Sequence, residues 1–431
     1  TYFSCIIGSM VYFWIYDFII FLFIIFFFPF IWRRIKPEKD YPFDWKERIG
    51  LYPEKIKEKS IWFQTVSVGE LFSITPLIKK IREKYPDERI IITVTTKTGR
   101  KICLENFPQI KVFFFPFDFS LIIRRALHLL NPKLIVLVET EIWPNLLRFA
   151  RRKGIPVIMI NGRISPKSFS GYKKFRFFSK KVLPLLTEIA MRTEEEARRI
   201  IYLGAEKEKV KVVGSIKFDQ AFSLSKKISP ESIRNLYGIP EDKRIVVFGS
   251  LHPGEEAGIV KVVKRILEKY KDVLCVIAPR FLDRTNIFKI LEDEKMEYGR
   301  RSKFPENKDC NLWIIDTYGE LNNFYAICEF AFVGGSLIRW GGQNPIEPAA
   351  FRKPVLFGKY NWHFFEEWKK IKGNGGGIEV EDYEDLYTKI CWLLDNPEEI
   401  RIKGEKAYRT VLENTGATLR NLEIIEKYLQ V

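Results

Sequence analysis

A glycine-rich segment near the C-terminal end of the chain, followed by a carboxylate, could bind a nucleotide. Gly334-Gly335 follows the apolar run Phe330 to Val333, and Gly341-Gly342 precedes Asn344-Pro345-Ile346-Glu347. Glycines admit the backbone close to a ligand, N–H groups at a helix start can meet phosphate, and a carboxylate can accept from ribose hydroxyls. A tight strand–helix connection, in which Glu347 only favours the helix start, explains the same spacing equally well.

A second carboxylate, Glu70, follows a predicted strand. The segment Ser67-Val68-Gly69-Glu70 fits a capping box, in which Ser67 caps a helix and Glu70 reaches back to its N–H. It also fits a general base at a strand end, because the helix terminus would keep Glu70 ionised and Gly69 would leave room for an acceptor hydroxyl. On spacing alone the cap is favoured over the base.

Two further carboxylates, Glu139 and Glu141, follow the apolar run Leu134 to Val138. Placed at one strand end, they could bind sugar hydroxyls or tune the base. Equally, Glu141 and Pro144 could simply start a helix.

In the second half of the chain, polar side chains again follow apolar runs. Ser250 and His252 offer donors for a single phosphate. Arg280 could grip a phosphate or a base, and the segment 316–320 ends a third run. All stand at predicted strand C-termini, which share one edge of a parallel sheet. Lys217 would add a cation, although a solvated surface lysine is the simpler interpretation.

The elements that must position these side chains alternate along the chain. Apolar β-rich runs alternate with amphipathic stretches such as Glu70–Lys84 and Asn145–Lys153, which indicates βαβ units and an α/β fold with parallel sheets. The expected strands are Trp62–Ser67, Ile90–Thr95, Val112–Phe115, Leu134–Val138, Val157–Ile160, Glu188–Met191, Val210–Val213, Ile245–Phe248, Val273–Ile277, Leu312–Ile315, Phe330–Val333 and Val355–Phe357. They form two doubly wound domains, with the cleft between their strand C-termini as the expected ligand site.

Domain boundaries follow from changes in composition. We expect a membrane anchor at 1–36, an N-terminal domain at 37–222, a linker at 223–243 and a C-terminal domain at 244–431. The linker is polar and contains Ser229-Pro230 and Ile239-Pro240. An N-terminal GxGxxG and a GxxxxGK[ST] phosphate loop are both missing, which disfavours NAD and ATP chemistry.

Composition narrows the class of partner. The 431 residues carry 71 Lys and Arg against 54 Asp and Glu, so the net charge is +17 and favours an anionic partner such as acidic lipid, a phosphorylated substrate or nucleic acid. The six cysteines show no CxxC pair, so neither zinc nor a disulfide framework is indicated.

The segment Val11 to Trp32 is apolar and aromatic except for Asp17. At about 1.5 Å per residue it is long enough to cross a bilayer, and Arg33 and Arg34 after it would leave the rest of the chain in the cytoplasm. Asp17 is a cost in such a span, explained by placement near an interface or by protonation. Lying in the interface is the alternative to spanning. Met10 is a candidate native start.

Ten motifs in order along most of the soluble part resemble the 3-deoxy-D-manno-octulosonic acid (Kdo) transferases of lipopolysaccharide synthesis. These enzymes move Kdo from CMP-Kdo to the lipid A precursor. The matching stretches are WKERIGLY (45–52), SVGE (67–70), TTKTG (95–99), ETEIWPN (139–145), NGRIS (161–165), GSIKFD (214–219), GSLHPGEE (249–256), APR (278–280), DTYGEL (316–321) and FVGGSL followed by GGQNPIEPAA (332–350). The ordered set is far more specific than any one motif.

The resemblance implies a GT-B glycosyltransferase fold, an N-terminal inner-membrane anchor with the catalytic domains on the cytoplasmic side, and a metal-independent inverting mechanism without a cofactor. Glu70 matches the family's proposed base. The CMP contacts fall on Pro279, Arg280, Tyr318, Gly319, Glu320, Asn344, Pro345, Ile346 and Glu347. Gln343 replaces a usual His, Ser215 a common Asn, and the stretch 359–363 lacks the family's Pro-His pattern, so these departures concern donor contacts.

The implied reaction is direct displacement, in which Glu70 deprotonates a glucosamine 6-hydroxyl of lipid IVA as that oxygen attacks the anomeric carbon of Kdo and CMP leaves. N–H groups near Ser250 and nearby cations would stabilise the leaving phosphate. The apolar segment and the +17 charge fit a membrane-embedded, doubly phosphorylated glycolipid and anionic lipid. Two alternatives are another GT-B transferase using a UDP-sugar, and a membrane-tethered protein that binds anionic lipid or nucleic acid. Basic and aromatic residues do not interleave in one patch, which disfavours nucleic acid.

Overall fold

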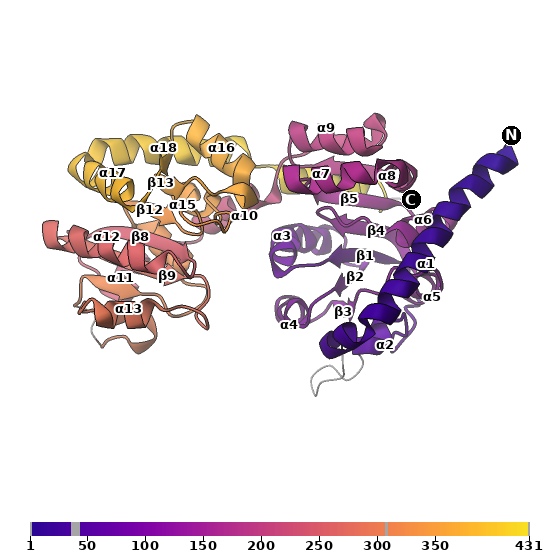
Figure 1. Cartoon of the computed structure of the whole chain (residues 1–431), viewed down its shortest axis with the longest axis horizontal. Helices are drawn as coiled ribbons and strands as arrows, with labels where there is room; N and C mark the ends of the chain where they lie inside the picture. Colours follow the sequence, from indigo (N-terminus) through magenta and orange to yellow (C-terminus); the bar gives the residue numbers. More distant parts are fainter. Residues whose placement is uncertain (1, 36–43, 307–308, 430–431) are drawn as a thin grey trace. The chain divides into compact units, whose positions relative to one another are not determined.

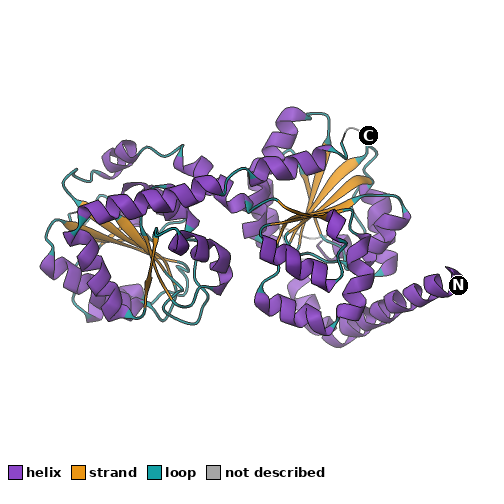
Figure 2. Cartoon of the chain, turned by 90° about the horizontal axis from the view of Figure 1, so that it is seen from above, coloured by secondary structure: helices purple, strands orange, loops and turns teal. Residues whose placement is uncertain are grey.

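The computed structural model describes residues 2–35, 44–306 and 309–429 and divides the chain into two compact units (Figure 1). Unit 1 comprises Thr1–Ile216 and Gly416–Val431, and unit 2 comprises Lys217–Thr415. Each unit is a parallel sheet with helices on both of its faces (Figure 2). The α/β class with two doubly wound domains is therefore confirmed.

The sheet of unit 1 contains, among the described residues, seven parallel strands in the order β3-β2-β1-β4-β5-β6-β7. They are β1 (Ser60–Thr65), β2 (Arg89–Val94), β3 (Lys111–Phe114), β4 (Pro132–Val138), β5 (Val157–Gly162), β6 (Glu188–Met191) and β7 (Val210–Val212). Chain order reverses between β1 and β4, which pair directly, with Phe63 opposite Val136. In a doubly wound sheet such a reversal opens a crevice beyond the strand ends.

Both faces of this sheet are buried. On β1, Trp62 belongs to one apolar core and its neighbours Ile61 and Phe63 to the other, because successive side chains point to opposite faces. Continuous runs such as Leu134 to Val138 therefore read as buried parallel strands. The helices of this unit are α1 (Tyr2–Ile35), α2 (Asp44–Arg48), α3 (Val68–Lys84), α4 (Lys97–Asn106), α5 (Ser120–Leu130), α6 (Pro144–Arg152), α7 (Pro166–Lys174), α8 (Arg176–Val182), α9 (Glu194–Leu203) and α19 (Ala417–Glu426).

Unit 2 repeats the architecture, with the strand order β10-β11-β9-β8-β12-β13-β14 among its described residues. The strands are β8 (Arg244–Leu251), β9 (Val273–Pro279), β10 (Gly299–Arg300), β11 (Leu312–Ile314), β12 (Phe330–Val333), β13 (Val355–Gly358) and β14 (Gly377–Val380). Its helices are α11 (Pro230–Tyr237), α12 (Glu256–Lys269), α13 (Ile287–Asp293), α14 (Leu321–Ile327), α15 (Ile346–Ala350), α16 (Phe365–Gly373), α17 (Tyr383–Asp395) and α18 (Pro397–Glu413), and α10 (Ile216–Ser225) leads into it from unit 1. Here the order reverses between β8 and β12.

Two boundaries differ from those expected from the sequence. The predicted linker, 223–243, includes α11, whose Tyr237 is buried in a core of unit 2 and stacks on Phe324 at 4.8 Å between ring centroids. The last helix, α19, returns to unit 1, where Leu422 and Ile425 join the core beside α3. The polar composition of 223–243 therefore belongs to the surface of a helix of unit 2 and not to a free linker.

The N-terminal apolar segment forms most of α1, with Pro29 inside the helix. In the parts of the chain that the structure describes, no helix is both long and apolar enough to cross a bilayer, so the predicted spanning segment Val11 to Trp32 is not supported. Part of α1 packs on unit 1 instead: Phe13 is 5% exposed and belongs to its core. Residues 36–43, where the predicted anchor gives way to the predicted N-terminal domain, lie outside the described residues.

Candidate functional site

Glu70 stands in the first turn of α3, directly after β1, and it does form the cap that its spacing predicts. Ser67 Oγ accepts from the N–H of Glu70 at 3.2 Å and donates to its Oε1 at 3.0 Å. The other carboxylate oxygen, Oε2, accepts from the N–H of Val66 at 2.7 Å. These bonds fix the carboxylate at the carboxyl end of the strand without using all of its lone pairs.

The cap does not exclude basicity, because burial shifts the ionisation of Glu70 toward neutral pH. Burial raises the pKa of Glu70 to about 7; the N–H of Val66 opposes this rise, and the nearby Glu139 adds to it. A carboxylate with such a pKa is matched to proton transfer near pH 7. Cap and base are thus compatible for this side chain.

Glu139 and Glu141 lie at the end of β4, which pairs with β1, so they share the sheet reversal with Glu70. Burial, together with the neighbouring Glu70 and Glu139, raises the pKa of Glu141 to about 8. Glu139 has φ of 59°, a left-handed conformation that is uncommon outside glycine. Helix α6 begins at Pro144 with Trp143 as its N-cap residue, so Glu141 does not cap it.

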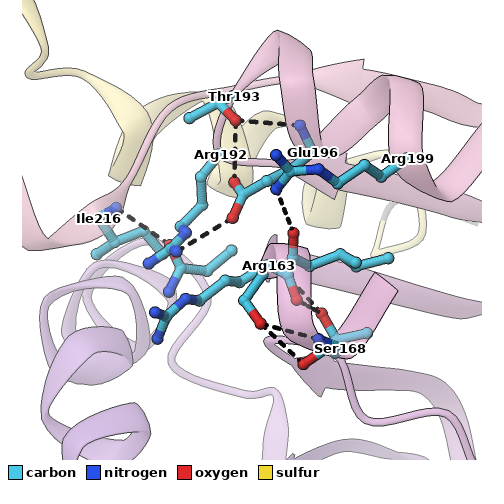
Figure 3. Close-up of polar contacts among 11 residues, drawn as sticks. Arg163, Ser168, Arg192, Thr193, Glu196, Arg199 and Ile216 are labelled. Atoms are coloured by element: carbon cyan, nitrogen blue, oxygen red, sulfur yellow. Dashed lines mark hydrogen bonds and ion pairs between the residues drawn. The ribbon is translucent and has the colours of Figure 1, made fainter. Parts of the chain in front are cut away.

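A basic cluster at the ends of β5 and β6 borders this acidic group, and the sequence did not single it out. Arg163 is tied to the acidic loop, since its N–H donates to Thr140 Oγ1 at 3.0 Å. Figure 3 shows the side chains of Arg163 and Arg192 extending to the same side. Arg192 pairs at 3.3 Å with Glu196, and both side chains are buried. The signal available in the sequence was that Arg163 and Arg192 directly follow two predicted strands.

Around this pair, further hydrogen bonds fix the strand ends (Figure 3). Thr193 caps α9, accepting from the N–H of Glu196 and donating to its carboxylate, each at 3.2 Å. Arg199 donates to the carbonyl of Ile164 at 2.8 Å. The result is a rigid edge that carries acidic and basic groups side by side.

In unit 2, a buried carboxylate accepts from the N–H groups of the glycine turn. Glu255 accepts from the N–H groups of Gly335, Ser336 and Leu337 at 2.6, 3.1 and 3.2 Å, and from that of His252 at 3.1 Å. Three N–H groups of the glycine turn are therefore bound to a carboxylate of the protein itself, which the sequence did not predict. These hydrogen bonds to Glu255 tie the loop after β12 to the loop after β8, at the point where the strand order reverses.

The turn after Gly341-Gly342 contains several of the predicted nucleotide contacts. Asn344 caps α15, since its Oδ1 accepts from the N–H of Ile346 at 3.1 Å while its Nδ2 donates to Glu347 Oε1 at 3.0 Å. Burial raises the pKa of Glu347, and Asn344, Arg280 and Lys217 oppose that rise. Arg280 and Lys217 therefore lie within electrostatic reach of Glu347. Lys217 also lies over the Phe364 ring, 4.8 Å from its centroid.

The side chains of His252 and Gln343 contact each other beside this turn. Their Nε2 atoms are 2.7 Å apart, and the His252 ring lies 4.4 Å from the centroid of Trp340. Burial, Arg280 and His363 lower the pKa of His252 to about 4, so the imidazole is neutral at pH 7. Gln343 thus holds a buried neutral histidine in place.

The segment after β11 divides into an exposed and an engaged part. The Tyr318 side chain is 76% exposed, and Gly319 has φ of 88°, which favours glycine. Glu320 accepts from Arg301 Nε at 3.0 Å and from the Tyr237 hydroxyl at 3.1 Å. Its carboxylate is therefore already occupied by the protein.

Comparison with known proteins shows which family this chain is similar to. Residues 44–220 match the family model described as 3-deoxy-D-manno-octulosonic-acid transferase (kdotransferase). The 3-deoxy-D-manno-octulosonic acid transferase of Haemophilus influenzae is 33% identical over 393 residues, which cover 89% of this chain and 91% of that protein. The counterpart from Chlamydophila psittaci is 29% identical over 85% of both chains.

Solved structures share the fold. UDP-GlcNAc 2-epimerase from Neisseria meningitidis, bound to UDP-GlcNAc, aligns with a TM-score of 0.61 at 14% identity, covering 86% of this chain and 99% of that one. A glycosyltransferase from Rickettsia africae aligns with a TM-score of 0.58 at 15% identity, covering 87% and 99%. The GT-B architecture is thereby confirmed.

Proposed function

This chain belongs to the 3-deoxy-D-manno-octulosonic acid transferase family, and we propose that it moves Kdo from CMP-Kdo to the 6-hydroxyl of the lipid A precursor, lipid IVA. The observation that carries this assignment of chemistry is Glu70, a buried carboxylate at the reversal of the unit 1 sheet, whose pKa is raised to about 7. Unit 1 would bind the acceptor and unit 2 the donor.

The chemical step is a direct displacement. Glu70 takes the proton of the acceptor hydroxyl while that oxygen forms a bond to the anomeric carbon of Kdo. The bond between that carbon and the CMP oxygen breaks, its electron pair leaves with CMP, and the configuration inverts. Gly69 at the helix start leaves open space next to the carboxylate, because a Cβ there would meet only Ser67 Oγ, at 3.9 Å.

The donor contacts are assigned to unit 2. Arg280, at the end of the β9 run with Pro279, supplies a guanidinium for the phosphate, and Glu347 supplies a carboxylate for ribose hydroxyls, held by Asn344. Because Glu320 is engaged by Arg301 and Tyr237, Tyr318 and the backbone of Gly319 are the groups left to approach the nucleotide there. CMP is a good leaving group with a single phosphate, so no metal ion is required.

Membrane association is assigned to α1. The helix side turned away from unit 1 exposes large apolar side chains, among them Trp14, Phe18, Ile19, Phe26 and Phe30. Phe26 is the most exposed of these, at 75%. We assign this side, the outer face of α1, to the interface of an anionic inner membrane, where Trp and Phe side chains partition favourably and the +17 charge is attracted. The lipid acceptor would be bound from the same surface.

Mass spectrometry of the product tests the proposal. The full chain is mixed with CMP-Kdo and lipid IVA in mixed micelles, and parallel reactions receive a UDP-sugar instead. Mass increments of one or more Kdo units would support the proposal and count the additions. Transfer from the UDP-sugar alone, or lipid binding without transfer of any sugar, would contradict it.

A further inference from the structure

Asp17 lies within the apolar helix α1, yet its half-buried carboxylate is bound by polar groups of α5 and α6. Its Oδ1 accepts from the N–H of Ser120 at 3.2 Å and from Asn145 Nδ2 at 2.7 Å, and its Oδ2 accepts from the Ser120 hydroxyl. Ser120 is the first residue of α5, whose own N-cap residue, Phe119, makes no side-chain bond. Asp17 therefore caps α5 from another element, at the helix end where negative charge is stabilising.

The preceding residue makes a parallel connection to α6. The Tyr16 hydroxyl donates to Asp118 Oδ2 at 3.0 Å. Asp118 in turn accepts from the N–H groups of Asn145 and Leu146 at 3.0 and 2.9 Å, replacing the side-chain cap that Trp143 lacks. Asp118 is 5% exposed. Two neighbouring residues of α1 thus reach the first turns of two successive helices.

Asn145 joins the two connections. It is fully buried, and its Nδ2 donates both to Asp17 and, at 2.8 Å, to the carbonyl of Asp118. Its Oδ1 lies 3.3 Å from Ser120 Oγ, so the amide stands beside the hydroxyl that donates to Asp17. A buried amide with these partners has little freedom to move.

Apolar and aromatic contacts fix the rotation of α1 about its axis. Phe13 lies under the guanidinium of Arg148, whose Cζ is 4.9 Å from the ring centroid. Phe13 and Tyr16 both contact Phe178 of α8, at 6.3 and 5.8 Å between centroids. Figure 1 shows α1 lying along unit 1 near α5 and α6, in agreement with these contacts.

The same contacts lead to the acidic group. Helix α6 begins at Pro144, directly after the loop that carries Glu139 and Glu141. Trp143, the last residue of that loop, packs on Phe115 at 4.7 Å between centroids. Because this connection between β4 and α6 is short, a displacement of the first turn of α6 must displace the carboxylates as well.

We infer that Asp17 is a positioning residue for the transfer reaction: by capping α5 and holding Asn145 at the start of α6, it fixes the loop that carries Glu139 and Glu141 beside Glu70. The inference rests on the proposed role of Glu70. On this inference, α1 does more than attach the chain to the membrane. It also connects its own outer face to the acidic group of the acceptor unit.

The test compares Asp17→Ala with wild type as full chains in detergent micelles, where attachment to a bilayer is not needed. We expect kcat to fall about tenfold or more, because small misplacements of reacting groups are costly. The KM for CMP-Kdo should stay unchanged, since the donor residues lie in unit 2. Asp17→Asn, which keeps one acceptor oxygen and the shape, should recover part of kcat.

Two further variants separate positioning from general damage. In Asp17→Ala combined with Asn145→Ala, kcat should fall no further than in the more impaired single variant, because both act through one contact. Glu268→Ala, which changes an exposed carboxylate of α12, should keep the wild-type kcat in micelles. Wild-type kcat in Asp17→Ala, or a double variant whose losses multiply, would overturn the inference.

Hydrogen exchange gives a readout that does not depend on turnover. In Asp17→Ala the amides of Asn145 and Leu146 should exchange at least several-fold faster than in wild type, while amides of unit 2 stay unchanged. Unchanged protection of these amides would contradict the positioning role whatever the activity. A wild-type chain that transfers no Kdo would contradict the proposed function instead, so the two failures are distinguishable.

Discussion

At the scale of single residues, Glu70, the proposed base, takes part in a helix cap through the same two oxygens. The N–H of Val66 holds Oε2 and the hydroxyl of Ser67 holds Oε1, so the carboxylate is oriented before any substrate arrives. Ser67 can turn its hydroxyl and accept once Glu70 has gained a proton. Spacing alone predicted the cap but could not show the burial that makes this group a base near neutral pH.

The raised pKa of Glu70 predicts the pH dependence of the reaction. Only the ionised carboxylate can take a proton, so kcat/KM should rise about tenfold per pH unit below pH 7 and level off above it, following the pKa of about 7. Steady-state kinetics between pH 5 and 9, with the CMP-Kdo concentration verified at each pH, measure this. A flat profile across pH 6 to 8 would contradict the assignment.

For Glu141, the raised pKa predicts that the stability of the fold depends on pH. Its pKa is raised in the folded state to about 8, so the folded chain binds this proton more tightly than the unfolded chain, and stability falls as pH rises from about 4.5 to 8. Glu141→Gln removes the buried charge. It should leave the free energy of unfolding nearly unchanged at pH 5 and raise it at pH 8 by on the order of 1–2 kcal/mol.

Denaturant unfolding at both pH values checks this expectation. The matched control is Glu268→Gln on the exposed side of α12, which should behave like wild type at pH 5 and at pH 8. Equal effects of Glu141→Gln at the two pH values would show that ionisation of Glu141 is not the cause.

At the scale of elements, the sequence predicted the alternation and most strand positions, because continuous β-branched runs are distinctive of buried parallel strands. Two edge strands were not predicted: β10 has only two residues, and β14 follows a glycine run that resembles a loop. The partners of Asp17 are more than 100 positions away in sequence, so its role as a cap could not be read from spacing.

Glu255 shows the same limitation at the glycine turn. The turn at Gly334-Gly335 was correctly placed after a strand, but the carboxylate that occupies its N–H groups comes from 80 positions earlier. The sequence contained the residue within GSLHPGEE without indicating its partner. The glycines indicated a close approach of the backbone, but not that a carboxylate of the protein itself accepts from these N–H groups.

Removing that anion should loosen the two loops at the reversal of the unit 2 sheet. Glu255→Ala leaves buried N–H groups unsatisfied, at about 1–3 kcal/mol each, so we expect unit 2 to lose several kcal/mol of stability and CMP affinity to fall with it. Thermal unfolding and calorimetric titration with CMP measure both. Glu268→Ala, exposed on α12, is the control. Unchanged stability in Glu255→Ala would contradict the role described for this carboxylate.

At the scale of the whole molecule, the proposed function divides acceptor activation and donor binding between the two doubly wound units and assigns membrane attachment to α1. Family membership and the GT-B architecture could be inferred from the order of motifs, most of which stand at strand ends. The manner in which α1 is used could not, since hydropathy indicates an apolar helix without showing which side packs on protein.

The outer face of α1 predicts the strength of membrane association. Replacing Phe18 and Phe26 by serine removes two aromatic rings that are more than half exposed, so binding to vesicles that contain anionic lipid should weaken at least tenfold. Vesicle sedimentation measures this, with Phe175→Ser, an exposed aromatic outside α1, for comparison. Equal retention of all variants on vesicles would contradict the assignment of this face.

We further predict that the enzyme does not require a metal ion for the reaction. Because CMP carries one phosphate and Arg280 and Lys217 lie near the proposed donor contacts, excess EDTA should leave kcat within about twofold of its untreated value. Loss of activity on chelation, restored by a divalent ion, would contradict a metal-independent mechanism.

The most direct test of the central claim is the single-turnover rate of Glu70→Gln. Glutamine keeps the bonds to Val66 and Ser67 but cannot accept the acceptor proton, and the donor residues in unit 2 are untouched. We predict that the rate of Kdo transfer falls about 10²- to 10⁴-fold while CMP affinity stays at the wild-type value and thermal stability does not fall. Transfer at a rate near that of wild type would contradict the assignment of Glu70 as the base.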